Sequence, residues 1–495
     1  MTLFADAPCY FTRARYVLLM ALFSSGMIAC TAMPPKPAVR LDVPAAFAES
    51  QGWTRANPQD AAPRGAWWQV FNDPVLDQLE NRVANANQSL QAALAAYDQA
   101  AALTTASRAQ FYPTLGAGLS ASRSKSATAG ASGSNSLQSH PSNTVSADLN
   151  ASWAPDLWGQ VRRQVAANEA AAQASAATLR STQLSLQATL AQTYLQLRVT
   201  DAQIRLAEQT VTAYQKALQQ TENRYRAGVV SAADVAQART QLLGAMVART
   251  DLAVTRAQQQ YAIAVLVGVA PAQFQLPASN ALPTVVAIPA GVPTQLLQRR
   301  PDLAAAERKV AQANEQIGIA QAAWFPTVTL SAQVGERASR LADLFSAPDL
   351  FWSLGPTLAA TLFDAGARRA QVESAQSNYR QTVANYRQTV LTAFQQTEDN
   401  LAAQRILGEE AELQRQTVQA AETSLRLAEN QYQAGTAPYL NVITAQAIAN
   451  GARTAELSLL GRRLTASVLL IQALGGSWGN AARPALGAAP VLRQE

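Results

Sequence analysis

The 495-residue sequence is poor in the side chains that many enzymes use as metal ligands and nucleophiles. It contains one histidine, His140, and two cysteines, Cys9 and Cys30. A metal site of the Cys/His type needs three or four such ligands, and nucleophilic catalysis needs a base beside the nucleophile. No glycine-rich phosphate loop opens a helix. These absences predict a protein that is not an enzyme and that has no cofactor and no bound metal.

Charged residues and long apolar runs are also scarce. Charged residues make up 15% of the chain, against about 25% in a typical soluble protein. The mean hydropathy is −0.05, and no apolar run of about 20 residues follows the N-terminal region. The isoelectric point of about 9.4 comes without a basic cluster or stripe. Nucleic acid is therefore not expected as a partner.

The N-terminus has the pattern of a secretion signal. A basic stretch precedes the short apolar segment 16–29, so residues 1–29 are predicted to be a signal peptide. The sequence Gly-Met-Ile-Ala-Cys that ends at Cys30 resembles a bacterial lipoprotein box, whose cysteine is lipidated and becomes the new N-terminus. Residues 30–73 would then be a lipidated N-terminal segment, and Thr31 in place of aspartate resembles sorting to the outer membrane. Ordinary signal cleavage beside an accidental cysteine is the alternative.

The rest of the chain is a tandem duplication. Residues 223–235 align without a gap with residues 430–442. Further matching pairs follow the same order: Phe111–Leu115 with Trp324–Val328, Gly159 with Gly366, and Gly244 with Gly451. Self-similarity of this kind sets the domain organisation. It comprises repeat 1 at 74–270, a linker at 271–293, repeat 2 at 294–476 and a C-terminal tail at 477–495.

Each repeat predicts a helix, two strands joined by a loop, a very long helix, a tight turn and a last helix. Ala, Gln, Leu, Arg and Glu dominate the helical stretches, and these residues are strong helix formers. The helices are expected at about 75–109, 160–226, 231–267, 295–322, 366–433 and 437–474. At 1.5 Å per residue the long helices reach on the order of 100 Å, so they must pack along one another. Loops between strands are expected at 122–143, which is rich in Ser, Gly and Ala, and at about 336–350.

The strands are predicted from strict alternation of apolar and polar residues at 145–153, 328–334 and 352–362. Segments of about ten alternating residues with aromatic ends are typical of a transmembrane β-barrel. A half-buried sheet in a soluble protein alternates in the same way. The signal sequence, the apolar outer face and the aromatic residues where strands meet helices favour the membrane.

Four strands in one chain predict an oligomer. Four strands cannot close a barrel, and open edges leave backbone groups unsatisfied in hydrocarbon. Two chains would give eight strands with a filled interior, and three would give twelve with room for a pore. Polar alternate residues such as Asp148 and Gln333 fit a wet lumen, which favours a homotrimer. The expected fold class is an α+β membrane protein, a duplicated long-helix α-barrel joined to a transmembrane β-barrel with four strands per chain.

Together these features resemble the TolC-like outer-membrane factor family, and within it the lipoprotein branch of efflux components (OprM/NodT type). The resemblance also includes the sequence RRPDLAAAERKVAQANEQIGIAQA at 299–322 and two Tyr-x-x-Gly turns. It implies the outer-membrane channel of a tripartite efflux pump, a passive duct for drugs or other small molecules. The implied partners are a periplasmic membrane-fusion adaptor, an inner-membrane resistance-nodulation-division transporter and outer-membrane lipid. The implied location is the outer membrane, lipid-anchored and extending into the periplasm.

The resemblance places two helix–turn–helix tips, at 226–234 and 433–441, at the far periplasmic end. Gly228 and Gly435 stand where a helix ends, Ser231 suits an N-cap, and Pro438 suits the first helical position. A plain helix hairpin explains these residues equally well. Adaptor-docking positions are expected at the tips: Gly228, Val229, Ser231, Gly435, Thr436 and Pro438.

The same tips are expected to close an aperture. The candidate gate residues are Arg224, Tyr225, Arg226, Asp234, Tyr432, Asn441 and Thr444. In a threefold assembly, Asp234 would form a ring of carboxylates that attracts cations. The matching positions of the second tip, Asn441 and Thr444, are neutral. Two other functions stay open on the sequence: a structural coiled-coil lipoprotein of the envelope, and an outer-membrane duct for type I protein secretion.

Overall fold

The structure is a computed structural model that describes residues 48, 66–125, 141–286, 300–346 and 349–476. The signal peptide, Cys30 and the C-terminal tail lie outside the described residues. The chain divides into two compact units. The first includes Ala101–Ala171 and Val310–Val383, and the second includes Ala172–Lys309 and the chain from Ala384 onward. Each unit therefore combines segments from both sequence repeats.

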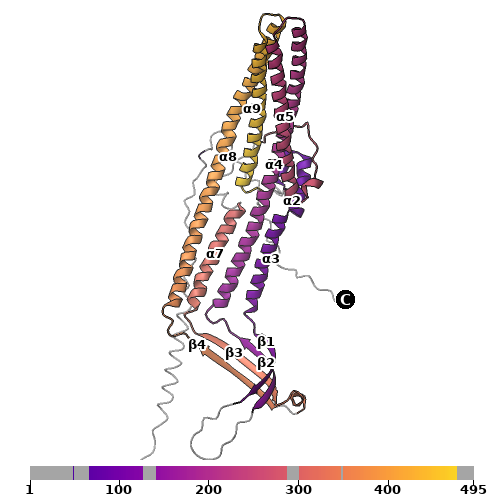
Figure 1. Ribbon diagram of the computed structural model, residues 1–495. Helices are drawn as coiled ribbons and strands as arrows, with labels where there is room; N and C mark the ends of the chain where they lie inside the picture. The colour runs from indigo at the N-terminus through magenta and orange to yellow at the C-terminus, as the bar shows by residue number, and fades with distance from the viewer. Residues whose placement is uncertain (1–47, 49–65, 126–140, 287–299, 347–348, 477–495) are drawn as a thin grey trace, which may run out of the picture. The chain divides into compact units, whose positions relative to one another are not determined.

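The first unit contains one antiparallel sheet of four strands in the order β1-β2-β3-β4 (Figure 1). The strands are β1 (Thr114–Ser124), β2 (Ser142–Trp153), β3 (Thr327–Ala338) and β4 (Asp349–Ala359). Because side chains alternate between faces, the register gives the sheet one face of exposed apolar residues: Leu115, Leu119, Leu149, Val334, Trp352, Leu354 and Leu358. The opposite face is mainly Gly, Ser, Thr and Asn. We call these the apolar face and the polar face.

The expected strand limits were partly wrong. The ladder of β1 and β2 extends to Ser124 and Ser142, so strands take up the ends of the loop expected at 122–143. Serine pairs on the polar face support this extension, as the Oγ atoms of Ser120 and Ser146 lie 2.8 Å apart. Likewise β3 and β4 shorten the loop expected at 336–350. At the other end β4 stops at Ala359, because β3 begins just after Pro326, which has no N–H to continue the ladder.

Aspartates cap the two longest helices, α4 (Gln160–Arg226) and α8 (Ala367–Gln433), at their first turns. Asp156 accepts hydrogen bonds from the backbone N–H groups of Val161 (2.9 Å) and Arg162 (3.0 Å). Asp364 accepts from the backbone N–H groups of Gly366 (3.1 Å) and Arg368 (3.2 Å). A carboxylate at a helix N-terminus satisfies free N–H groups and complements the helix dipole. Both helices thus begin at a defined residue after the sheet.

The remaining helices are α2 (Pro74–Ala86), α3 (Gln88–Ala109), α5 (Ala232–Leu266), α7 (Pro301–Ala322) and α9 (Tyr439–Ala473). The single helix expected at about 75–109 was wrong, because Asn87 interrupts it. The Asn87 Oδ1 accepts from the N–H of Leu90 (3.0 Å), and its Nδ2 donates to the carbonyl of Leu266 (2.8 Å). No helix among the described residues is long and apolar enough to cross a membrane.

The main core lies in the second unit. Trp68 of η1 (Trp67–Phe71) and Val83 of α2 belong to the same buried cluster as Leu190 and Tyr194 of α4. Residues near the ends of α5 and α9 complete it: Ile263, Ala264, Leu464 and Val468. The cluster joins segments from both repeats around the middle of α4.

Polar contacts in the second unit connect α5 to α4, α4 to α9 and α9 to α8. These helices are labelled in Figure 1. Asn450 of α9 donates to the Tyr214 hydroxyl of α4 (3.2 Å), and Arg453 of α9 pairs with Glu422 of α8 (2.7 Å). Most of the exposed large apolar residues of these helices lie on α5 and α8, with Leu440 and Ile448 on α9. Those on α5 and α8 are Leu243, Met246, Val247, Val254, Tyr261, Val265, Leu391, Ile406, Leu413 and Leu427. In contrast, α4 exposes one such residue among those described, Tyr225 in its last turn.

Candidate functional site

Both tips end their first helix in the same way. In the first tip, Gly228 has φ +74, its N–H donates to the carbonyl of Tyr225 (2.9 Å), and the Val229 N–H donates to the carbonyl of Arg224 (2.9 Å). In the second tip Gly435 has φ +75, and its bonds repeat the pattern. This is the Schellman arrangement, in which glycine takes the left-handed conformation at low cost. The prediction that these two glycines end a helix in the left-handed conformation is confirmed.

The second helix of each tip starts differently. Ser231 is the N-cap of α5 as predicted, and it forms a capping box with Asp234. Asp234 Oδ2 accepts from the Ser231 N–H (2.9 Å) and from the Ser231 hydroxyl (2.8 Å). Pro438 was expected at the first helical position of α9, but it is the N-cap, because its ψ of 156° is extended rather than helical. Asp234, which has no acidic counterpart in the second tip, thus has a local role as part of a helix cap.

The two tips meet through aromatic side chains. The guanidinium carbon of Arg224 lies 4.4 Å from the ring centroid of Tyr432, and the rings of Tyr432 and Tyr439 are 5.2 Å apart. Burial raises the pKa of Tyr439. A small apolar cluster surrounds these rings: Ala217, Leu218, Ala238, Ala428, Val442 and Ile443. We call this contact the tip clamp, defined by Arg224, Tyr432 and Tyr439.

The structure brings some predicted gate residues together and leaves others apart. Arg224 and Tyr432 touch, whereas Arg226 bonds to its own helix through the Asn223 Oδ1 (2.6 Å). Four predicted gate residues are exposed: Tyr225, Arg226, Asn441 and Thr444. All six predicted docking positions are exposed as well: Gly228, Val229, Ser231, Gly435, Thr436 and Pro438. Sequence reasoning missed Tyr439, although its seven-residue spacing from Tyr432 across the turn was visible.

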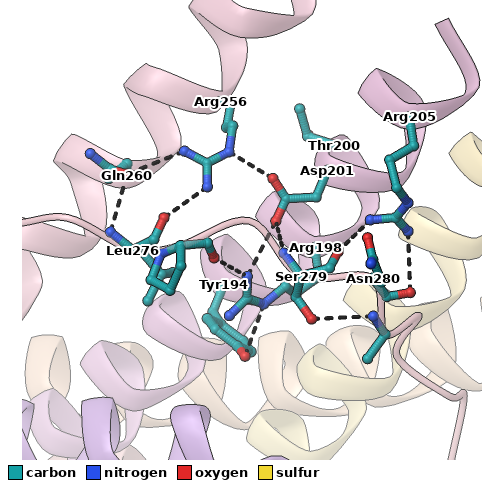
Figure 2. Close-up of polar contacts among 12 residues, drawn as sticks. Tyr194, Arg198, Thr200, Asp201, Arg205, Arg256, Gln260, Leu276, Ser279 and Asn280 are labelled. Atoms are coloured by element: carbon teal, nitrogen blue, oxygen red, sulfur yellow. Dashed lines mark hydrogen bonds and ion pairs between the residues drawn. The ribbon is translucent and has the colours of Figure 1, made fainter. Parts of the chain in front are cut away.

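A buried polar network, shown in Figure 2, was also missed. Asp201 of α4 accepts hydrogen bonds from Arg256 Nε of α5 (2.6 Å), from Arg198 Nη1 (3.2 Å) and from the Ser279 N–H (3.2 Å). The Asp201 side chain is 1% exposed and that of Arg198 is 5% exposed. A carboxylate this deeply buried needs such partners, because its desolvation is costly.

The same network anchors the segment that follows α5. Arg256 Nη2 donates to the carbonyl of Leu276 (2.8 Å), and Arg198 Nη1 donates to that of Pro277 (2.9 Å). Arg205 donates to the carbonyls of Ser279 and Asn280 (Figure 2). We call this set of contacts the linker anchor, defined by Arg198, Asp201, Arg205 and Arg256. It fixes the start of the sequence linker on α4 and α5 without regular secondary structure.

The N-terminal side of the core joins the linker anchor through Tyr194. Its hydroxyl donates to Asp73 Oδ2 (2.6 Å) and accepts from Arg198 Nε (3.0 Å). Burial, followed by the hydrogen bond with Asp73, raises the pKa of Tyr194. Asp73 is also the N-cap of α2. Among the described residues no group of three His, Cys, Asp or Glu side chains could hold a metal ion. The arrangement is suited to joining helices, and the exposed tips are suited to contact with other chains.

Comparison with known proteins places this fold in a class. The family described as outer membrane efflux protein matches residues 79–269 and 292–476, and the chain belongs to this family. It is an outer-membrane protein, the channel subunit of a tripartite efflux pump that works with adaptor and inner-membrane transporter components. The resemblance to the TolC-like outer-membrane factors is thereby confirmed, and the coiled-coil tether is not the function.

The similar proteins include two curated relatives and a solved structure. The antibiotic efflux pump outer membrane protein ArpC of Pseudomonas putida is 32% identical over 455 residues, covering 91% of this chain and 93% of that protein. The pyoverdine export outer membrane protein OpmQ of Pseudomonas aeruginosa is 33% identical over 430 residues, covering 86% and 90%. The outer-membrane channel OprN aligns with a TM-score of 0.82 at 27% identity, over 90% of this chain and 99% of that one.

Proposed function

We propose that three copies of the chain form a passive duct for drugs or other small molecules, with no catalytic step. The observation that carries this proposal is the four-stranded sheet with exposed leucines and a tryptophan on one face and small polar residues on the other. Within the described residues each end strand, β1 or β4, pairs with a neighbouring strand on one side only, which leaves its other edge open. Edges of this kind require partners in a membrane, and twelve strands close a barrel wide enough for a lumen.

The helices support the same assembly through α5 and α8. Tyr261 of α5 is 29 residues from the start of that helix (261 − 232), and Ile406 of α8 is 27 residues from its end (433 − 406). The corresponding counts are 22 for Val254 and 20 for Leu413. Because α5 starts at the first tip and α8 ends at the second, the two residues of each pair lie at similar distances from the tips. Seven-residue spacing on both helices suits knobs-into-holes packing, so the α5 of one copy is expected to pack on the α8 of the next.

A paired-cysteine variant tests this assembly. Oxidation of Val254→Cys/Leu413→Cys in cells is expected to give disulfide-linked dimers and trimers in the outer-membrane fraction, because the two positions would face each other between copies. Denaturing gels without reductant provide the measurement. Each single variant is the control and should stay monomeric on the gel. The trimer would be contradicted if the double variant ran as a monomer on the gel and the native detergent-solubilised protein had the mass of a monomer.

We further propose that the tip clamp closes the periplasmic aperture, with Asp234, Arg226, Tyr225, Asn441 and Thr444 around it. The contact between Arg224 and Tyr432 supports this assignment, since it joins the two hairpins of one chain at their tips. The exposed turn residues, among them Val229 at 61% exposure, are proposed as the surface for the adaptor. The cognate transporter is proposed to be of the resistance-nodulation-division type.

Removing the cation from the tip clamp is expected to open the channel. A cation–π contact is worth about 0.5–2 kcal/mol, so Arg224→Ala should raise the leak conductance of purified trimers in planar bilayers by several-fold. Arg426→Ala is the matched control and should conduct as wild type does, because Arg426 lies outside the predicted gate and its guanidinium bonds within its own helix to Thr423. Equal conductance of both variants and wild type would exclude Arg224 from the gate. Asp234→Ala tests whether Asp234 also lines the pore. The substitution should change the cation preference if the carboxylate faces the pore, and should leave it unchanged if the carboxylate only caps α5.

We propose that Cys30 carries the lipid anchor in the outer membrane. The lipoprotein-box sequence supports this proposal, and so does the absence of any other cysteine after the signal peptide. The mass of the mature N-terminal peptide checks it. An unmodified cysteine, or a different first residue, would contradict it.

A further inference from the structure

The polar face of the sheet carries one charge in the middle of its strands. The register aligns Gly118, Asp148, Gly335 and Phe351 across the four strands. Within those strands the other charged residues of this face are Arg337 and Asp349, which lie opposite each other at the end of the sheet. Opposite charges placed across a strand pair attract and offset each other. Arg337 also lies over the ring of Phe351, 5.0 Å from its centroid. Asp148 is therefore the unbalanced charge of this surface.

Glycines on both neighbouring strands leave room for the Asp148 side chain to lie along the wall. A Cβ on Gly118 would lie 3.0 Å from Asp148 Oδ1, and a Cβ on Gly335 would lie 2.8 Å from Asp148 Cβ. Gln333 on β3 holds the carboxylate from the side, with its Nε2 3.1 Å from Asp148 Oδ2. A side chain at Gly118 would push the carboxylate away from the sheet, whereas a Cβ on Gly335 would first meet the Ala147 carbonyl oxygen (2.6 Å) and the Phe351 ring (2.7 Å).

We infer that Asp148 sets the charge preference of the outer-membrane section of the duct, with the glycines recessing its carboxylate so that the passage stays wide. This inference rests on the proposed function, because the polar face lines a lumen only in the closed barrel. Three copies then place three carboxylates in one ring. Such a ring favours cations and cationic solutes and disfavours anions. The Asp234 carboxylate at the tip caps α5 through Ser231, and its own contribution to the charge preference is measured separately by Asp234→Ala.

Reversal potentials across a KCl gradient test the assignment, recorded on trimers opened by Arg224→Ala. Adding Asp148→Asn removes three charges from the trimer and is expected to lower the cation-to-anion permeability ratio by at least about two-fold, since each charge lies several ångströms from the ion path in water. Both salt concentrations should stay below about 0.1 M, because the field of a charge then extends over about 10 Å before it is screened. Adding Gly118→Ala should instead change the ratio by displacing the carboxylate into the lumen, and it should lower the conductance.

Gly355→Ala is the matched control, since Gly355 lies on the same face and a Cβ there would meet no atom within 4 Å. It should leave both the ratio and the conductance unchanged. If the Arg224→Ala/Asp148→Asn trimer conducts with the same reversal potential as its Arg224→Ala parent, the role of Asp148 is overturned and the duct is not. Absence of conductance from every variant, and also from trimers in which Arg224, Tyr432 and Tyr439 are all replaced by alanine, would overturn the duct and this inference with it.

Discussion

Replacing Asp201 by alanine is expected to be among the most destabilising single changes in this protein. The substitution leaves Arg198 and Arg256 in a buried site without their carboxylate partner. Removing one partner of a buried ion pair costs about 3–5 kcal/mol. The Ser279 N–H loses its acceptor as well, so the start of the linker should be held less firmly on α4, by the bonds that Arg198 and Arg205 still donate to its carbonyls. The thermal unfolding midpoint of the detergent-solubilised protein should fall clearly, and proteolysis near residues 276–280 should accelerate.

Two comparisons make this result specific to the linker anchor. Asp251→Ala removes an exposed carboxylate from α5 and should leave the unfolding midpoint within error of wild type. Asp201→Asn keeps the shape of the side chain but not its charge, and it should lie between wild type and Asp201→Ala. An Asp201→Ala protein as stable and as protease-resistant as wild type would show that the network does not hold the linker.

Replacing Glu80 by glutamine is expected to stabilise the protein at neutral and alkaline pH. Glu80 of α2 is 0% exposed, and neither of its carboxylate oxygens has a hydrogen-bond partner among the described residues. Burial, with a smaller effect from the charge of Asp77, raises the pKa of Glu80 from 4.5 to about 9. Between these values the folded protein holds a proton that the unfolded chain releases. The contribution of protonated Glu80 to the free energy of unfolding is therefore fully present below pH 4.5 and is lost as the pH rises toward 9.

The neutral amide removes this dependence. One pKa unit corresponds to about 1.4 kcal/mol, so at pH 7 the gain from Glu80→Gln is on the order of 3 kcal/mol. Thermal midpoints of wild type and variant should coincide near pH 4.5 and separate progressively up to pH 8.5. Glu208→Gln, at an exposed position of α4, should follow wild type at every pH. Parallel curves for Glu80→Gln and wild type would show that Glu80 is not protonated in the folded protein.

The long helices show how far local patterns reach. The expected limits 160–226 and 366–433 agree with α4 and α8 to within one residue, because Ala/Gln/Leu-rich runs and glycines at the turns act locally. The capping box was also visible in the sequence as Ser231 followed three residues later by Asp234, yet the acid was interpreted as a gate residue. The break at Asn87 had no comparable local signal, since one of its partners is the carbonyl of Leu266.

The duplication, the period-two strands, the capped turns and the family resemblance all follow from the order of residues along the chain. The strands and the capped turns depend on neighbours a few positions apart, where periodicity and turn chemistry act, and the duplication and the resemblance need only the comparison of sequences. The tip clamp, the linker anchor and the recessed Asp148 depend instead on which distant segments meet. Arg224 and Tyr432 belong to different repeats, Asp201 binds a linker amide, and Asp148 lies between glycines from two strands. These contacts were decided by tertiary packing, because burial and cross-strand register select partners that sequence spacing does not reveal.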